Sequence, residues 1–216
     1  MKLVILGLGY SASYYAAHRA GAFERVTGTR RAPKAERLGH IELLPFDGAA
    51  PSADPRLLKA LAEADALLVS AGPDAQGDPA LRLLAKDIAA APKLKKIVYL
   101  STIGVYGDQG GAWIDETAST DPANGRSRLR LAAEAGWGGL TQGAAREIYI
   151  LRLSGIYGPG RNVLVKLREG TARRLVKPGQ VFNRIHVEDI ARAIGVSCAA
   201  SKSCSGGGAT PSFCAA

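Results

Sequence analysis

Residues 1–17, MKLVILGLGYSASYYAA, determine how the rest of the chain is interpreted. Residues 2–6 form a short apolar run typical of a buried strand, Gly7-Leu8-Gly9 interrupts it, and residues 11–20 have helical character. A glycine pair between a strand and a helix indicates a dinucleotide-binding loop, because the first glycine permits a tight turn and the second lets a diphosphate approach the backbone. The helix then offers free amides and its positive dipole end. The competing interpretation is a glycine turn that binds nothing.

Strand and helix patterns alternate along the first 153 residues, which predicts a parallel sheet covered by helices. The expected strands are 2–6, 24–29, 41–46, 66–70, 96–101 and 147–153, and the expected helices are 11–20, 33–38, 55–64, 79–91 and 123–141. Right-handed crossovers place all the carboxyl ends of such strands, and a bound cofactor with them, at one edge. We therefore expect an α/β fold, a Rossmann-type doubly wound parallel sheet, with residues 1–160 as the NAD(P)-binding domain.

Composition narrows the class of protein and its partners. The chain has 216 residues and a net charge of +9, and no apolar run reaches the roughly 20 residues that cross a bilayer. No cleavable signal is recognised, so we expect a cytoplasmic protein without a membrane partner. Residues 161–184 hold seven basic residues against Glu169 alone. This patch lacks the aromatic interleaving of nucleic-acid binders, so an anionic cofactor or substrate is favoured over nucleic acid.

The last nineteen residues differ in character from the rest. They contain all three cysteines, Cys198, Cys204 and Cys214, in a stretch of Ser, Gly and Ala without periodicity. The cysteine spacing and the missing histidine disfavour zinc, so no metal site is expected, and a reducing compartment disfavours a disulfide. We expect residues 198–216 to be an aberrant, disordered tail, the product of a frameshift or a truncation.

The end of the second expected strand bears on the choice of dinucleotide. Chains that select NAD usually place Asp or Glu there, where it binds the ribose 2′-hydroxyl. This chain has Thr29-Arg30-Arg31 and no acid. Because a guanidinium pair suits a 2′-phosphate, the sequence favours NADP(H) over NAD(H). The alternative is a pair of exposed arginines in a solvated loop.

Further motifs follow the expected strands in order. They are Gly7-Leu8-Gly9, Phe46-Asp47, Ser70-Ala71-Gly72, LSTIGVYG at 100–107, IYGPG at 156–160 and IHVEDIA at 185–191. On the basis of these motifs, residues 1–197 resemble the extended short-chain dehydrogenases/reductases, the NAD-dependent epimerase/dehydratase family. The resemblance implies that Asp47 binds the adenine amino group and that Ala71 and Gly72 line the nicotinamide ribose. The candidate cofactor-binding residues are Gly7, Gly9, Tyr10, Ser11, Ala12, Thr29, Arg30, Arg31, Phe46, Asp47, Ser70, Ala71, Gly72 and Thr102.

The resemblance also implies a catalytic arrangement, from which this chain departs. Thr102 matches the catalytic Ser/Thr that hydrogen-bonds the substrate oxygen. The family's Tyr-x-x-x-Lys pair is replaced by Asn124 and Arg128, and an amide cannot carry a proton at neutral pH. The chain thus resembles the atypical members that lack the usual acid–base pair. Three other residues could replace the tyrosine, but each is expected to be structural: Tyr106, Tyr157 and His186.

Extended family members carry a C-terminal substrate lobe, of which we expect only a remnant at residues 161–197. Helices that would pack on the rest of the lobe would expose apolar surface, a liability for solubility or a face for a homodimer. The leading hypothesis is an NAD(P)-dependent oxidoreductase or epimerase/dehydratase acting on an unidentified sugar nucleotide or small carbonyl compound. The alternatives are a non-catalytic NADP(H)-binding sensor or scaffold and, ranked last, a nucleic-acid binder.

Overall fold

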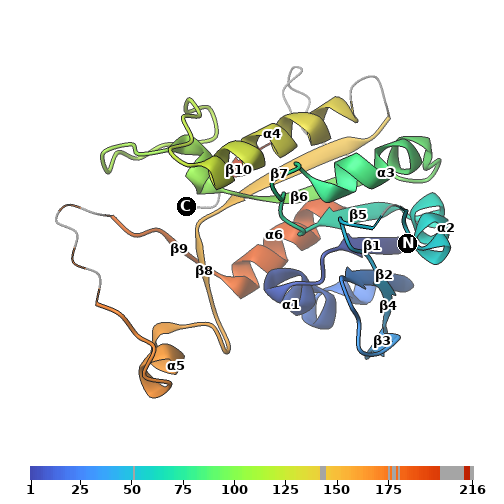
Figure 1. The fold of residues 1–216 in the computed structure, drawn as a ribbon, viewed down its shortest axis with the longest axis horizontal. Coiled ribbons are helices and arrows are strands. Elements are labelled where there is room, and N and C mark those ends of the chain that lie inside the picture. The colour runs from blue at the N-terminus through green and yellow to red at the C-terminus, as the bar shows by residue number, and fades with distance from the viewer. Residues whose placement is uncertain are drawn as a thin grey trace.

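The computed structural model describes residues 1–50, 52–141, 145–174, 176, 179, 181–199 and 212–214 (Figure 1). The strands are β1 (Lys2–Leu6), β2 (Arg25–Arg30), β3 (Arg37–Leu38), β4 (Ile41–Pro45), β5 (Ala66–Val69), β6 (Lys96–Thr102), β7 (Glu147–Leu153), β8 (Gly155–Tyr157), β9 (Arg184–His186) and β10 (Ser212–Cys214). The α-helices are α1 (Tyr10–His18), α2 (Pro55–Glu63), α3 (Pro79–Ala90), α4 (Gly125–Gly139), α5 (Val163–Arg168) and α6 (Val187–Ala199). Two short 3₁₀ helices are η1 (Ala20–Ala22) and η2 (Ile103–Tyr106).

The main sheet has the strand order β10-β7-β6-β5-β1-β2-β4-β3. All neighbouring pairs are parallel except β3 with β4. The order reverses at β1, so a crevice forms outside the carboxyl ends of β1 and β5, where doubly wound folds bind ligands. This confirms the expected Rossmann-type fold. Strands β8 and β9 form a separate small sheet.

Each face of the main sheet has its own apolar core. Successive residues of a strand point to opposite faces, so Leu3 and Ile5 of β1 join one cluster and Val4 and Leu6 join the other. The first cluster is completed by α1 and α6, and the second by α2, α3 and α4. Figure 1 shows α1 and α6 together on one side of the sheet. Buried on both faces, the strands are continuous apolar runs.

The expected helix at residues 33–38 is wrong. This stretch bends, and its end forms β3, in which Arg37 pairs with Glu42 and Leu38 with Ile41 of β4. The Leu43 amide also donates to the Glu36 carbonyl at 2.7 Å. A single basic turn of helix has no apolar face to bury and would leave its backbone groups in water. Pairing with the open edge of the sheet gives these backbone groups hydrogen-bond partners.

The region after β7 exposes apolar side chains, as expected. Helix α5 has no buried residue, and its Val163, Leu164 and Leu167 are 61–71% exposed. Helix α6 continues to Ala199, so Cys198 is buried in the core. Residues 200–211, which include Cys204, lie outside the described residues. Beyond them, strand β10 pairs in parallel with β7.

Candidate functional site

The loop between β1 and α1 approaches the end of β5 so closely that only glycine fits. Gly7 has a φ of +87°, and a Cβ atom there would lie 2.6 Å from the Ala71 nitrogen. The Gly7 amide donates to Thr29 Oγ1 at 2.9 Å, and the Leu8 amide donates to the Thr29 carbonyl at 2.8 Å. The structure therefore brings together Gly7, Thr29 and Ala71, three residues predicted from the sequence. Thr29 stabilises the turn at Gly7 from its buried position on β2.

The first turn of α1 is open to an anion. Gly9 caps the helix without a side-chain hydrogen bond, the turn has no acidic residue, and a Cβ at Gly9 would meet nothing within 4 Å. The amides of the first helical residues, Tyr10, Ser11 and Ala12, have no acceptor in the preceding turn. Uncapped amides at the positive end of a helix dipole suit a diphosphate. The diphosphate-binding role of Gly9 stays a prediction, which this geometry supports.

The Tyr10 side chain brings a distant cation to this turn. Its hydroxyl donates to the Pro159 carbonyl at 3.0 Å, and the Arg161 guanidinium lies 5.4 Å from its ring centroid. Arg161 is exposed. The basic segment identified in the sequence therefore begins beside the candidate diphosphate site.

The ends of β2 and β4 line a smaller cavity of about 350 Å³. Arg31, Phe46 and Asp47 all line it, so the structure brings these three sequence-predicted residues together. Arg30 is exposed at the end of β2 and is not among the lining residues. A guanidinium and a carboxylate beside a buried aromatic ring can hold the phosphate and the planar base of a nucleotide.

Arg130 of α4 is a site residue that sequence reasoning missed. Its Nη2 atom would lie 2.8 Å from a Cβ placed on Gly72, and its Nη1 donates to the Leu100 carbonyl at 2.8 Å and to the Tyr99 hydroxyl at 3.1 Å. The guanidinium is therefore fixed beside the Ser70-Ala71-Gly72 turn. The helical spacing of Ser127, Arg130 and Glu134 was the available signal, since these positions share one face of α4.

Asn124 and Arg128 both make hydrogen bonds to the backbone near the start of α4. Asn124 caps α4 by accepting from the Ser127 amide at 2.9 Å, and it lines the larger cavity described below. Arg128 is exposed and donates to the Pro122 carbonyl at 3.3 Å. The cation that reaches the end of the sheet from α4 is thus Arg130, two residues beyond the expected position.

Two hydroxyl groups flank Gly104 at the end of β6. Thr102 Oγ1 accepts from the Gly104 amide at 3.2 Å. A Cβ placed on Gly104 would lie 2.8 Å from Ser127 Oγ and 3.5 Å from Thr102 Oγ1. Ser127 was not singled out in the sequence, because its approach to Thr102 depends on how α4 packs. The pair can donate two hydrogen bonds to one substrate oxygen.

A buried ionic network supports this end of the sheet. Arg152 Nη2 lies 2.8 Å from Glu134 Oε2, Ser101 donates to Glu134, and Arg152 Nη1 donates to the Tyr106 hydroxyl at 2.8 Å. Burial alone lowers the pKa of Arg152, but its hydrogen bonds to Glu134 and Tyr106 raise that pKa above the ordinary value. The network joins β6, β7, α4 and η2. Tyr106 is 1% exposed and belongs to this network, and a packing role for it stays a prediction.

Tyr157 and His186 lie together on the small sheet. Their ring centroids are 5.0 Å apart in an edge-on arrangement, and His186 Nδ1 accepts from the Glu188 amide at 3.3 Å at the start of α6. Both interactions fit the structural roles expected for these residues.

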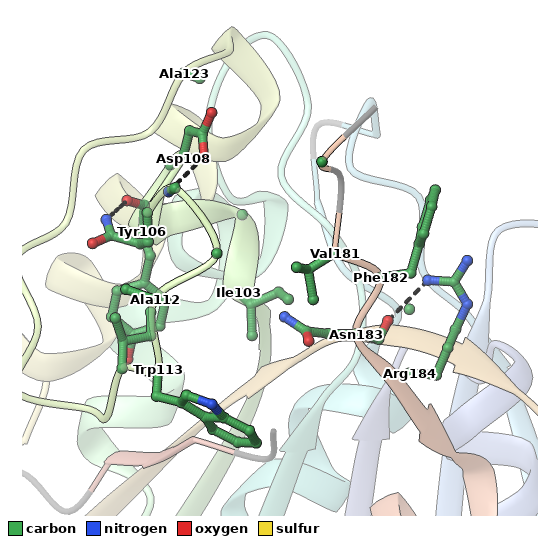
Figure 2. Close-up of a pocket in the computed structure, with 18 of the residues that line it drawn as sticks. Ile103, Tyr106, Asp108, Ala112, Trp113, Ala123, Val181, Phe182, Asn183 and Arg184 are labelled. Carbon is green, nitrogen blue, oxygen red and sulfur yellow. Dashed lines mark hydrogen bonds between the residues drawn. The ribbon is translucent and has the colours of Figure 1, made fainter. Parts of the chain in front are cut away.

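A cavity of about 1330 Å³, larger than the one at β2 and β4, is lined in part by Gly104. Figure 2 shows Tyr106, Ala112 and Trp113 on one side and Val181, Phe182, Asn183 and Arg184 on the other. The cavity therefore lies between the loop after β6 and the segment before β9, and of the residues around the hydroxyl pair it is lined by Gly104.

The described residues contain neither a membrane-spanning helix nor a metal-binding cluster. No helix there is long and apolar enough to cross a membrane. No cluster of three or more His, Cys, Asp or Glu side chains there is placed to hold a metal ion.

Comparison with known proteins gives solved structures of similar fold and a curated relative of similar sequence. No family model matches the chain. A conserved protein of unknown function from Silicibacter pomeroyi DSS has a TM-score of 0.77 and 42% identity, over 92% of this chain and 68% of that one. A Methylobacillus flagellatus structure, provisionally named an NAD-dependent epimerase/dehydratase, has a TM-score of 0.68 and 26% identity, over 91% and 69% of the two chains. Protein YeeZ of Escherichia coli K12 is 29% identical over 89% of this chain and 71% of its own length.

Proposed function

Because this chain belongs to the extended short-chain dehydrogenase/reductase family, the NAD-dependent epimerases/dehydratases, we propose that it binds a nicotinamide dinucleotide between β1 and α1. The observation that carries the proposal is the turn at Gly7, clamped against Ala71 and followed by a helix start that no side chain caps. The same turn fits the diphosphate, since backbone amides and a helix dipole are its preferred ligands.

Specific residues would hold each part of the dinucleotide. The amides of Tyr10, Ser11 and Ala12 would bind the diphosphate, and Gly72 with Arg130 would contact the nicotinamide ribose. The adenosine would occupy the end of β4, where Phe46 and Asp47 line the smaller cavity together with Arg31. We propose NADP(H) over NAD(H), because Arg30 ends β2, Arg31 follows it, and neither position is an acid, while a guanidinium pairs well with a 2′-phosphate.

We propose an oxidoreductase or epimerase/dehydratase reaction on a sugar nucleotide or small carbonyl compound. A bound nicotinamide supplies or accepts hydride. Thr102 and Ser127 would donate hydrogen bonds to the substrate oxygen, and Arg130 would orient the ribose. Because its hydrogen bonds to the Leu100 carbonyl and the Tyr99 hydroxyl hold its guanidinium in place, Arg130 would act as a positioning residue.

The second candidate is a non-catalytic NADP(H)-binding sensor or scaffold. It is favoured by the start of α4, where Asn124 is a helix cap and Arg128 contacts only a backbone carbonyl among the described residues. A cytoplasmic location and a homodimer stay predictions, as does the absence of a nucleic-acid partner.

Fluorescence titration with NADPH and NADH tests the proposal. We expect Gly9→Ala to keep its fold, because the added methyl meets no atom, and to lose at least about tenfold in affinity for both coenzymes. We expect Arg30→Ala/Arg31→Ala to lose at least about tenfold for NADPH, the value of one charged hydrogen bond, and little for NADH. Arg25→Ala, exposed at the other end of β2, is the matched control.

Three outcomes count against parts of the proposal. If folded wild-type protein binds neither coenzyme, dinucleotide binding is wrong. Equal losses for NADPH and NADH in the double variant would refute the NADP(H) preference. If coenzyme binds but labelled NADPH transfers no hydride to any sugar nucleotide or carbonyl compound in a screen, the sensor or scaffold replaces the enzyme.

A further inference from the structure

Arg161 ends a tight turn that follows the small strand β8. The turn consists of Gly158, Pro159, Gly160 and Arg161, and its two end residues exchange backbone hydrogen bonds of 3.0 Å. Proline at the second position and a glycine with a φ of +70° at the third are typical of a type II turn. Because proline fixes its own φ and hydrogen bonds close the turn, the backbone at Arg161 has a defined position.

This turn is attached to Tyr10, the first residue of α1. The Tyr10 hydroxyl donates to the Pro159 carbonyl at 3.0 Å. The packing is close, since a Cβ placed on Gly158 would lie 2.6 Å from the Tyr10 hydroxyl and 2.6 Å from Val187 Cγ1. The turn that carries Arg161 is therefore held against the residue whose amide begins the candidate diphosphate site.

The Arg161 guanidinium lies over the ring of Tyr10. Its Cζ atom is 5.4 Å from the ring centroid, which is within the range of a cation–π contact. The side chain is exposed, and within the described ranges its guanidinium forms no ion pair and donates no hydrogen bond. Every Asp and Glu of the chain lies in those ranges. The N–H groups of this guanidinium are therefore available to a ligand.

A diphosphate at the start of α1 has more negative charge than the helix can balance. Each phosphate of a dinucleotide carries a negative charge, whereas the amino end of a helix is equivalent to about half of a positive charge. The first turn, residues 10–13, contains no basic side chain. A guanidinium binds phosphate through charge-assisted hydrogen bonds that are frequently bidentate. The charge balance therefore favours a guanidinium beside this helix end.

We infer that Arg161 binds the diphosphate of the coenzyme and that Tyr10 positions it. The inference rests on the proposed function and adds to the β1–α1 loop a side chain from the far end of the sheet sequence. Tyr10 contributes its amide to the diphosphate, its ring to the guanidinium and its hydroxyl to the turn. Since NADH and NADPH share the diphosphate, Arg161 serves the affinity for both coenzymes and not the choice between them.

The test measures the affinities of the full chain for NADH, NADPH and ADP-ribose by calorimetry. ADP-ribose contains the same diphosphate and lacks the nicotinamide ring. We expect Arg161→Gln to weaken all three ligands by about tenfold, the value of one charged hydrogen bond. Arg173→Gln is the matched control, because it removes the same charge from an exposed residue of the same basic segment. It should leave all three affinities close to those of the wild type.

A second set of variants tests the part played by Tyr10. Tyr10→Leu removes the ring and the hydroxyl and keeps the backbone amide. If the ring positions the guanidinium, Arg161→Gln should cost a smaller factor in the Tyr10→Leu background than in the wild type. Tyr10→Phe keeps the ring and loses the hydrogen bond to Pro159, so most of the effect of Arg161→Gln should remain. Circular dichroism establishes that each variant is folded.

Several results would overturn the inference. The contact with the diphosphate is wrong if Arg161→Gln binds the coenzymes as tightly as the wild type, or if Arg173→Gln loses as much. It is also wrong if Arg161→Gln weakens NADH and NADPH but not ADP-ribose. The positioning role of Tyr10 is wrong if Arg161→Gln costs the same factor in both backgrounds. Failure of the proposed function is a separate result, in which the folded wild type binds none of the three ligands and both assignments fall.

Discussion

Replacing Glu134 by alanine should destabilise the protein more than removing any surface carboxylate. The Glu134 and Arg152 side chains are 4% and 12% exposed, and they meet at 2.8 Å. Removing one partner of a buried pair leaves an uncompensated charge, at a cost of about 3–5 kcal/mol. Arg152 keeps its hydrogen bond to Tyr106, so we expect the lower end of that range, about 3 kcal/mol. For a chain of this length that corresponds to a fall in Tm of about 6–12 °C.

Urea and thermal denaturation followed by circular dichroism measure this loss. The matched control is Glu24→Ala, whose carboxylate is 72% exposed and lies 3.8 Å from the amino terminus, and it should cost less than about 1 kcal/mol. Adding Arg152→Ala to Glu134→Ala should recover part of the loss, since the double variant buries no unpaired charge. The reasoning is refuted if Glu134→Ala costs no more than Glu24→Ala.

Three further predictions concern the backbone turn, alkaline pH and a helix end. Gly7→Ala should lower the denaturation midpoint more than Gly39→Ala. Both glycines have positive φ, but of the two only Gly7 would place a Cβ 2.6 Å from a backbone atom. Equal losses in the two variants would show that the turn relaxes to accept the methyl group. Burial raises the pKa of Cys198 from 9.0 to about 11, so its contribution to stability is complete below about pH 9 and is lost as pH rises through 11. The midpoint should therefore fall more steeply over that range in wild type than in Cys198→Ala, and parallel curves would contradict this. Arg146→Ala should lower the free energy of unfolding in urea by about 1–3 kcal/mol, because it removes hydrogen bonds of 2.5–3.3 Å to three carbonyls at the end of α3. If Arg146→Lys keeps the full stability of the wild type, the positive charge and not the set of hydrogen bonds is responsible.

Local patterns in the sequence were sufficient for most of the sheet. The expected strand at 147–153 matches β7, and the one at 2–6 matches β1, because continuous apolar runs bounded by turns are buried in any parallel sheet. The helix starts at Pro55 and Pro79 follow Asp54 and Asp78, whose carboxylates accept from backbone amides in the first turn. The basic stretch at 33–38 failed, because its structure depends on the edge of β4 and not on its own residues.

Local sequence patterns were enough to predict the succession of strands and helices along the nucleotide-binding half and the glycine turn at its first loop, since periodicity, caps and turn residues act within a few positions. The tertiary structure alone decided which α4 side chain meets Gly72, that Ser127 joins Thr102 beside Gly104, and that Glu134 pairs with Arg152. These contacts join residues far apart in the chain. They depend on the rotation and depth at which α4 packs on β6 and β7, which is set by the shape of the whole core rather than by any local run of residues.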